Sequence, residues 1–409
     1  MKKNFLSKSI IDLFNIFIIL GFVPIYYKTK WLSLDKIPQI NFYLILLFTY
    51  IVFIKRICSK KLLCKRGFLI NRNIYIFLFS VFVISLISTN SHKEFLLNYL
   101  KLVCTVIYAN YLVEYYSIKD LVCILVKVHS IILILNIIYF NLFPNNSYDI
   151  LDNTSAVSAL FTQKNQFGTE LAFGVLMSYI NLIYGNNRMK ILSIFNIIAS
   201  IYILTLVQSV TSIITIIIPI ILLQVYRLKK GKINIVNILI ILNFLVVIIV
   251  FYGDYFNEFF VKILNRDITL TGRVDIWKAI LATINMRIFL GFGYFTFWGY
   301  NPYYESRIRS MTFSALSSGH NAFFELLLNV GIIGVIIFIL FLLNIGKKIV
   351  KIKEFETIDI SLVIVYLSYI ILFFISERTL WPLHYQTLLI FVCTIIVNNK
   401  LNNFRNKKE

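Results

Sequence analysis

The chain alternates between apolar runs of about 20 residues and mostly short polar connections, and this pattern constrains its fold more than any other feature. In a bilayer, backbone N–H and C=O groups must find partners within their own segment, so such runs fold as membrane-spanning helices. Only 14% of the residues are charged, against about 25% in soluble domains. The sequence therefore predicts an all-α polytopic membrane protein and excludes a soluble enzyme.

Twelve spans are predicted from these runs, within a single integral membrane domain over residues 1–409. They fall near residues 10–27, 39–54, 68–88, 95–113, 120–143, 166–184, 190–207, 210–226, 233–252, 321–345, 358–376 and 381–398. The stretch from 190 to 226 is the least distinct. It is either two short helices that turn at Gln208-Ser209 or one long tilted helix.

The distribution of basic residues predicts the orientation of these spans. With the N-terminus in the cytoplasm, 25 of the 40 Lys and Arg residues fall in inner segments, whereas the short outer loops hold six. Lys and Arg accumulate on the cytoplasmic side of membrane proteins, so we expect both termini in the cytoplasm. The net charge of +21 comes from Lys and Arg residues that lie mostly between the apolar runs. They do not form a folded basic module, which argues against nucleic acid as a partner.

One predicted outer connection, residues 253–320, is much longer than the others. Connections of this length in a helical bundle are usually functional or disordered, and this one is too rich in aromatic residues for disorder. We expect it to contain helices at the outer membrane interface and to carry the chemistry. Isoleucine at every fourth position from Ile276 to Ile288 predicts an amphipathic helix, which the turn Gly291-Phe-Gly293 would end.

Two residues of this connection are the candidate catalytic groups. Arg273 stands at the start of the predicted helix, where the helix dipole favours an anion and a guanidinium suits a phosphate. A pairing with Asp275, or contact with lipid headgroups, is the alternative. His320 lies at the outer mouth of a span and can exchange a proton near neutral pH; a histidine bonded only to backbone is the alternative. Glu325 is expected to orient this imidazole or to pair with an arginine.

Further polar residues of the predicted outer face are candidate ligands for an anionic headgroup with attached sugars, although each could be an ordinary solvated loop residue. These substrate-binding candidates are Lys164, Asn165, Arg307, Arg309, Asn321, Glu325 and Arg378. Burial of an ionisable group inside a membrane is energetically unfavourable, so ionisable residues within the predicted spans are candidate functional residues as well. They are Lys101, Lys127, His129 and Glu170. The sequence shows no metal-binding cluster, Walker loop or nucleophile elbow, so no metal and no cofactor are expected.

Three motifs together resemble the O-antigen polymerase and ligase superfamily (Wzy and WaaL), which are polytopic membrane glycosyltransferases. They are Gln163-Lys164-Asn165-Gln166-Phe-Gly168 before a span, Thr271-Gly272-Arg273 with Trp277 and Leu290-Gly291-Phe-Gly293, and His320-Asn321 followed by Gly331 and Gly334. Each motif is short, but their order and topological positions match. One departure is Ser209-Val210-Thr211, where many members have an arginine; another cation would have to supply the charge that is missing at Val210.

The resemblance implies a glycosyltransferase of the bacterial cell membrane whose active site faces outward and needs no metal or nucleotide. Arg273 would bind the diphosphate of an undecaprenyl-diphosphate-linked oligosaccharide, and His320 would activate the acceptor. The expected function is polymerisation of repeat units of O antigen, capsule or exopolysaccharide. An O-antigen ligase and a transporter or flippase for lipid-linked sugars are the alternatives. Membrane lipid, a chain-length regulator and a flippase are the expected partners.

Overall fold

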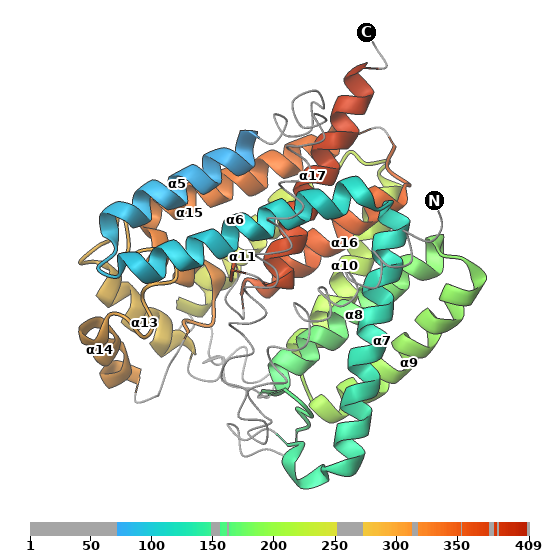
Figure 1. The fold of residues 1–409 in the computed structure, drawn as a ribbon, viewed down its shortest axis with the longest axis horizontal. Coiled ribbons are helices and arrows are strands. Elements are labelled where there is room, and N and C mark those ends of the chain that lie inside the picture. The colour runs from blue at the N-terminus through green and yellow to red at the C-terminus, as the bar shows by residue number, and fades with distance from the viewer. Residues whose placement is uncertain are drawn as a thin grey trace.

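All the regular secondary structure that the computed structural model of the chain describes is helical, apart from one isolated bridge between Tyr148 and Val157 (Figure 1). The described residues are 72–148, 156–161, 163–251, 273–312, 318–352, 354–375, 380–382 and 384–406. The helices are α5 (Arg72–Ser88), α6 (His92–Tyr115), α7 (Ile118–Leu142), α8 (Lys164–Tyr184), α9 (Asn187–Val207), α10 (Val210–Leu228), α11 (Ile235–Phe251), α13 (Arg273–Ile284), α14 (Pro302–Thr312), α15 (Ala322–Val350), α16 (Ile358–Phe373) and α17 (Tyr385–Asn406), with a short 3₁₀ turn, η2 (Pro144–Asn146).

Ten of the predicted spans coincide with described helices, namely α5 to α11 and α15 to α17. The other two, 10–27 and 39–54, lie outside the described residues. Within the described part, α6, α7, α8, α9, α10 and α15 are long and apolar enough to cross a bilayer, and α5, α11 and α16 are shorter apolar helices. The all-α, multi-pass fold class is thus confirmed, while the total of twelve spans remains a prediction.

Residues 190–226 form two helices and not one long helix. The backbone of Gln208, the residue that follows α9, is left-handed (φ 56°), and Ser209 occupies the N-cap position of α10. A left-handed residue ends helical hydrogen bonding, and serine is a favoured N-cap. The turn predicted at Gln208-Ser209 is confirmed, and both helices pack against α8.

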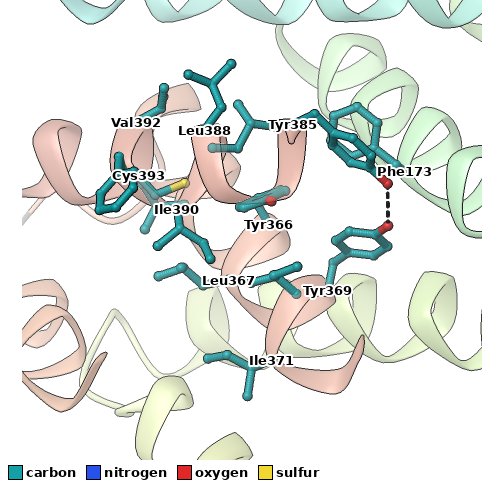
Figure 2. Packing of buried hydrophobic residues seen from close by; sticks show 14 of the residues in the cluster. Phe173, Tyr366, Leu367, Tyr369, Ile371, Tyr385, Leu388, Ile390, Val392 and Cys393 are labelled. Carbon is teal, nitrogen blue, oxygen red and sulfur yellow. Dashed lines mark hydrogen bonds between the residues drawn. The ribbon is translucent and has the colours of Figure 1, made fainter. Parts of the chain in front are cut away.

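Helix α16 is the centre of the bundle. Its sequence is apolar on all sides, and α8, α10, α11 and α17 contact it, so that residues 360–373 are all buried. A helix that is apolar all round must be covered all round. Figure 2 shows its packing against α17 and α8: the hydroxyls of Tyr369 and Tyr385 are 3.2 Å apart, and the ring of Phe173 lies beside both tyrosine rings.

Helix α15 is kinked at Gly331, whose backbone angles (φ 62°, ψ −172°) are essentially restricted to glycine. A segment of chain some 40 residues before Gly331 inserts at the kink. Phe292 N–H donates to the carbonyl of Leu328, and Ile332 N–H donates to the carbonyl of Ile288, both at 2.8 Å. These bonds replace intrahelical ones and divide α15 into a short initial segment and a long apolar segment.

The described connections predicted to be outer lie on one side of the bundle, from the α5–α6 turn beside α13 and α14 to the end of α7 (Figure 1). There Thr89 Oγ1 donates to Thr296 Oγ1 at 3.0 Å, and Ala322 N–H donates to the carbonyl of Phe374 at 2.9 Å. The connections predicted to be inner lie on the opposite side, where Arg227 joins α10 to α16. The long connection contains α13 and α14, which pack against each other. Which end faces outward, and whether α13 and α14 lie at a membrane interface, remain predictions.

Candidate functional site

His320 precedes α15 in a strained backbone conformation. Its φ of 47° lies in the left-handed region, which costs a residue with a side chain about 1–2 kcal/mol. The next residue, Asn321, is the N-cap of α15 and accepts hydrogen bonds from Phe323 N–H (2.9 Å) and Phe324 N–H (3.3 Å). Its amide donates to the carbonyl of Ile375 at 3.3 Å. The chain immediately after His320 is therefore held by the helix cap and by the end of α16.

Gly319, the residue before His320, is held through both of its backbone polar groups. The carboxylate of Glu325 accepts a hydrogen bond from Gly319 N–H, and Trp277 Nε1 donates to the carbonyl of Gly319 at 3.0 Å. Trp298 Nε1 donates to both oxygens of Glu325, at 3.1 and 3.2 Å. Glu325 is only 3% exposed, and a buried carboxylate is stable only with such partners. Glu325 thus joins the start of α15 to the aromatic loop between α13 and α14.

Helix α13 brings Arg273 toward this segment. The helix packs against α15 and buries Ile276, Trp277 and Ile280, the face that the isoleucine spacing predicts. Arg273 is its first residue and lies about 6 Å, one helical turn, before Trp277. Trp277 bonds to Gly319, so Arg273 starts the helix one turn before the residue that contacts the Gly319–His320 segment. The side chain of Arg273 lies outside the described part.

The end of α13 differs from the prediction. The helix ends at Ile284, before Ile288, and beyond it Met286 N–H and Arg287 N–H donate to the carbonyls of Thr283 and Ile284, three residues back, in turns. The predicted glycine turn is confirmed, since Gly291 and Gly293 have φ values of 67° and 101°.

Lys164 and Asn165 form the first turn of α8, and both are half-buried. Further along the same helix, the carbonyl of Thr169 accepts a hydrogen bond from Tyr369 Oη of α16 at 3.3 Å. The two helices contact each other in opposite directions, so the start of α8 lies level with the end of α16. The structure thereby brings Lys164 and His320 to the same end of α16.

A third helix begins beside these two. Gly168 of α8 faces the first turn of α10, where Ser209 Oγ is 2.8 Å from Ser212 Oγ, and a Cβ at Gly168 would overlap Ser212. Helix N-termini present free N–H groups and partial positive charge, which favour anions. The starts of α8, α10 and α15 therefore meet around one end of α16. Val210, where the resembled family has an arginine, is 43% exposed.

The predicted arginines Arg307 and Arg309 both lie on α14. Arg309 forms a 3.1 Å salt bridge with Glu305, whose carboxylate also accepts a hydrogen bond from Gly299 N–H at 2.6 Å. Arg307 lies 3.9 Å from the sulfur of Met286. The structure thus gives both arginines contacts within the protein, and their binding of substrate stays a prediction.

The other predicted ligands also have positions that bear on their roles. The side chain of Asn321 caps α15, and the side chain of Glu325 bonds to Gly319. Both residues therefore have a structural role within the chain. Their contact with substrate stays a prediction. Arg378 lies outside the described residues, three positions after Ile375, which bonds to Asn321.

Two residues of this site, Trp277 and Trp298, are not among the candidate site residues from the sequence. Trp277 does stand within the second motif of the family resemblance, and for both tryptophans the need of a buried indole N–H for an acceptor is a further sequence signal. The acceptors themselves, at Gly319 and Glu325, lie 42 and 27 positions away in the chain.

Of the ionisable residues within predicted spans, His129 and Glu170 prove to be neighbours. His129 Nδ1 lies 3.7 Å from Glu170, His129 Nε2 lies 3.0 Å from Ser200 Oγ, and the imidazole packs where a Cβ at Gly174 would overlap it. Pairing lowers the cost of both groups inside the bundle. Lys127, by contrast, is exposed.

Metal binding can be examined only for the described residues. Among them, no three His, Cys, Asp or Glu side chains lie close enough together to hold a metal ion. The expectation that the protein works without a metal remains a prediction.

Residues 195–339 match the family model described as O-antigen ligase. The matched region runs from α9 into α15 and includes Arg273, His320, Asn321 and Glu325, whereas Lys164 precedes it. No curated protein matches the chain significantly. The match agrees with the resemblance to the O-antigen polymerase and ligase superfamily that the motifs predict. Together with the six long apolar helices of the described part, it defines the class as a multi-pass membrane protein with an O-antigen-ligase-type region.

Proposed function

We propose that this protein is a polysaccharide polymerase, which transfers a growing glycan from undecaprenyl diphosphate to the next lipid-linked repeat unit. The observation that carries the proposal is that the region matching the O-antigen ligase family contains a strained histidine at the end of α16, where three helices begin. Arg273 and Lys164 add two cations to the same region. The active site faces outward and both termini lie in the cytoplasm.

The transfer follows from the chemistry of these groups. The acceptor hydroxyl attacks the anomeric carbon of the donor, the bond between that carbon and the diphosphate oxygen breaks, and the hydroxyl proton passes to His320. The lipid diphosphate leaves with the bonding electrons, so negative charge grows on it. Arg273, Lys164 and the helix N-termini are suited to stabilise that charge, because fixed donors and cations act most strongly where charge develops.

An O-antigen ligase is the second candidate, because that is the description of the matching family. A ligase would use the same donor but hand the finished polymer to a different acceptor. A transporter or flippase for lipid-linked sugars is the third reading, and the experiment below separates all three. As a polymerase, the protein would work with a flippase and a chain-length regulator of the same pathway.

Deletion of the gene, followed by electrophoresis of surface and lipid-linked glycans, tests the proposal. We expect the polymer ladder to disappear and single repeat units to remain. In the deletion strain, the rate of chain growth with Arg273→Ala should be about 10² to 10³-fold lower than with the wild-type protein, because one charge-stabilising contact is lost. Arg273→Lys should restore chain growth partly. Lys278→Ala, which removes an exposed cation from the same helix, is the matched control.

Two other results would contradict the polymerase. Long chains that accumulate on the lipid carrier would identify a ligase. An unchanged ladder would exclude both transferases and favour the transporter.

A further inference from the structure

The strained backbone of His320 needs support from both sides. A residue in the left-handed region persists only when its surroundings hold it there, and such strain is concentrated at functional sites. After His320, the support is the cap formed by Asn321. Before His320, it is Gly319, whose backbone N–H and carbonyl bond to two different elements.

The backbone of Gly319 is held on both sides of its Cα. Its N–H, in the peptide unit shared with Ser318, bonds to Glu325 of α15, and its carbonyl, in the peptide unit shared with His320, accepts from Trp277 of α13. A Cβ at Gly319 would meet Ile280 of α13 at 2.7 Å. Rotation of either peptide unit would break one of the two hydrogen bonds. Because Gly319 directly precedes His320, its conformation sets the direction in which the imidazole leaves the chain.

Glu325 can hold Gly319 only while its own carboxylate is fixed. Trp298 fixes it with one indole N–H shared between the two carboxylate oxygens, at 3.1 and 3.2 Å. Trp298 is half-buried, and its ring meets Phe297, which is fully buried, edge to face at 4.9 Å. The loop between α13 and α14 is thereby connected to His320 in three steps. Trp298 bonds to Glu325, Glu325 bonds to Gly319, and Gly319 is the residue before His320 in the chain.

We propose that Trp298 and Glu325 are positioning residues, which act through the backbone of Gly319 to hold the imidazole of His320 in the orientation for proton transfer. The inference rests on the proposed function, and it assigns to Trp298 a role that is exerted through Glu325. Misplacement of a catalytic group by about 1 Å can cost 10²-fold in rate, so a loosened Gly319 backbone should lower turnover and leave substrate binding intact.

The test uses the full chain, purified and supplied with lipid-linked oligosaccharide extracted from cells that lack the gene. Trp298→Phe removes the indole N–H and keeps an aromatic ring. Glu325→Gln keeps an acceptor for Gly319 but places an amide N–H₂ or a single oxygen toward Trp298. Tyr303→Phe removes a polar atom from an exposed ring at the start of α14, directly after this loop, and is the matched control.

We expect both variants to lower kcat about 10- to 100-fold with KM changed by no more than about twofold, and the control to match wild type. Because Trp298 acts through Glu325, the double variant should be no slower than Glu325→Gln alone. Full activity of Trp298→Phe, additive losses in the double variant, or loss of folded Trp298→Phe protein in gel filtration would each overturn the inference.

A second readout does not depend on activity. Diethyl pyrocarbonate modifies accessible imidazoles, and mass spectrometry of the His320 peptide gives the rate of its modification. We expect this rate to change in Trp298→Phe and Glu325→Gln but not in Tyr303→Phe; equal rates in all proteins would overturn the inference. If the wild-type protein does not extend the oligosaccharide, the proposed polymerase fails, and the modification rates alone then decide whether Trp298 and Glu325 position His320.

Discussion

Replacement of His320 by asparagine should stop chain growth while the protein remains folded in the membrane. Asparagine tolerates the left-handed backbone found at this position (φ 47°), so His320→Asn removes the imidazole without adding strain. General acid–base catalysis contributes about 10² to 10⁴-fold, and we expect turnover to fall by that factor. Electrophoresis of lipid-linked glycans should then show single repeat units in place of a ladder.

The controls for this experiment separate chemistry from folding. His320→Ala lacks the base and also carries the left-handed strain, so it should be as inactive as His320→Asn and somewhat less stable. His92→Ala removes an exposed histidine at the start of α6, at the same end of the bundle, and should leave the ladder unchanged. A full-length ladder made by His320→Asn would show that the imidazole is not the base.

Replacement of Gly331 by alanine should prevent the protein from folding. The backbone angles at Gly331 are essentially restricted to glycine and cost any other residue about 1–3 kcal/mol. In addition, the new Cβ would overlap the carbonyl group of Phe289 and the backbone nitrogen of Leu290, which belong to the segment inserted at the kink. That segment cannot move away without breaking its bonds to α15. We expect little monodisperse protein in gel filtration after detergent extraction.

Gly299→Ala is the matched control for this prediction. Gly299 also has a positive φ (87°), but a Cβ there would meet nothing within 4 Å. This variant therefore carries backbone strain without steric overlap and should lose only about 1–2 kcal/mol of stability. If Gly331→Ala behaves like Gly299→Ala, the inserted segment does not pack against the kink as the structure shows.

The helices themselves could be predicted from the sequence because a bilayer offers the backbone no other hydrogen-bond partners. Each long apolar run must satisfy its own hydrogen bonds, so its length and position appear directly in the sequence. Even the weakest assignment, the turn at Gln208-Ser209, follows from local residues that favour a helix end and a helix start.

The kink of α15 could not be predicted in the same way. Its cause is a tertiary contact, in which the carbonyl of Ile288 accepts a hydrogen bond from Ile332 more than 40 residues later. In the segment that leads to this contact, the backbone changes to turns after Ile284, so α13 stops before Ile288 although the isoleucine spacing continues. The periodicity of a sequence indicates which face of a segment is apolar. It does not indicate which distant backbone N–H groups will donate hydrogen bonds to the carbonyls of that segment.

The candidate site was predictable in its residue types but not in its connections. His320 and Asn321 stand out as polar residues before an apolar run, and asparagine there is a typical N-cap, which is the role the structure gives it. Trp277 bonds to Gly319, and Trp298 bonds to Glu325. These bonds join parts of the chain that are far apart in the sequence, and the sequence does not show that they meet in space.

The most direct test of the proposed function is reconstitution of the purified chain in lipid vesicles with radiolabelled lipid-linked repeat units taken from cells that lack the gene. We expect the label to move into a ladder of lipid-linked products that grows by whole repeat units, also in the presence of a metal chelator, and not to do so with His320→Asn. Label that stays in single repeat units with the folded wild-type protein would contradict the proposal that this chain is the polymerase.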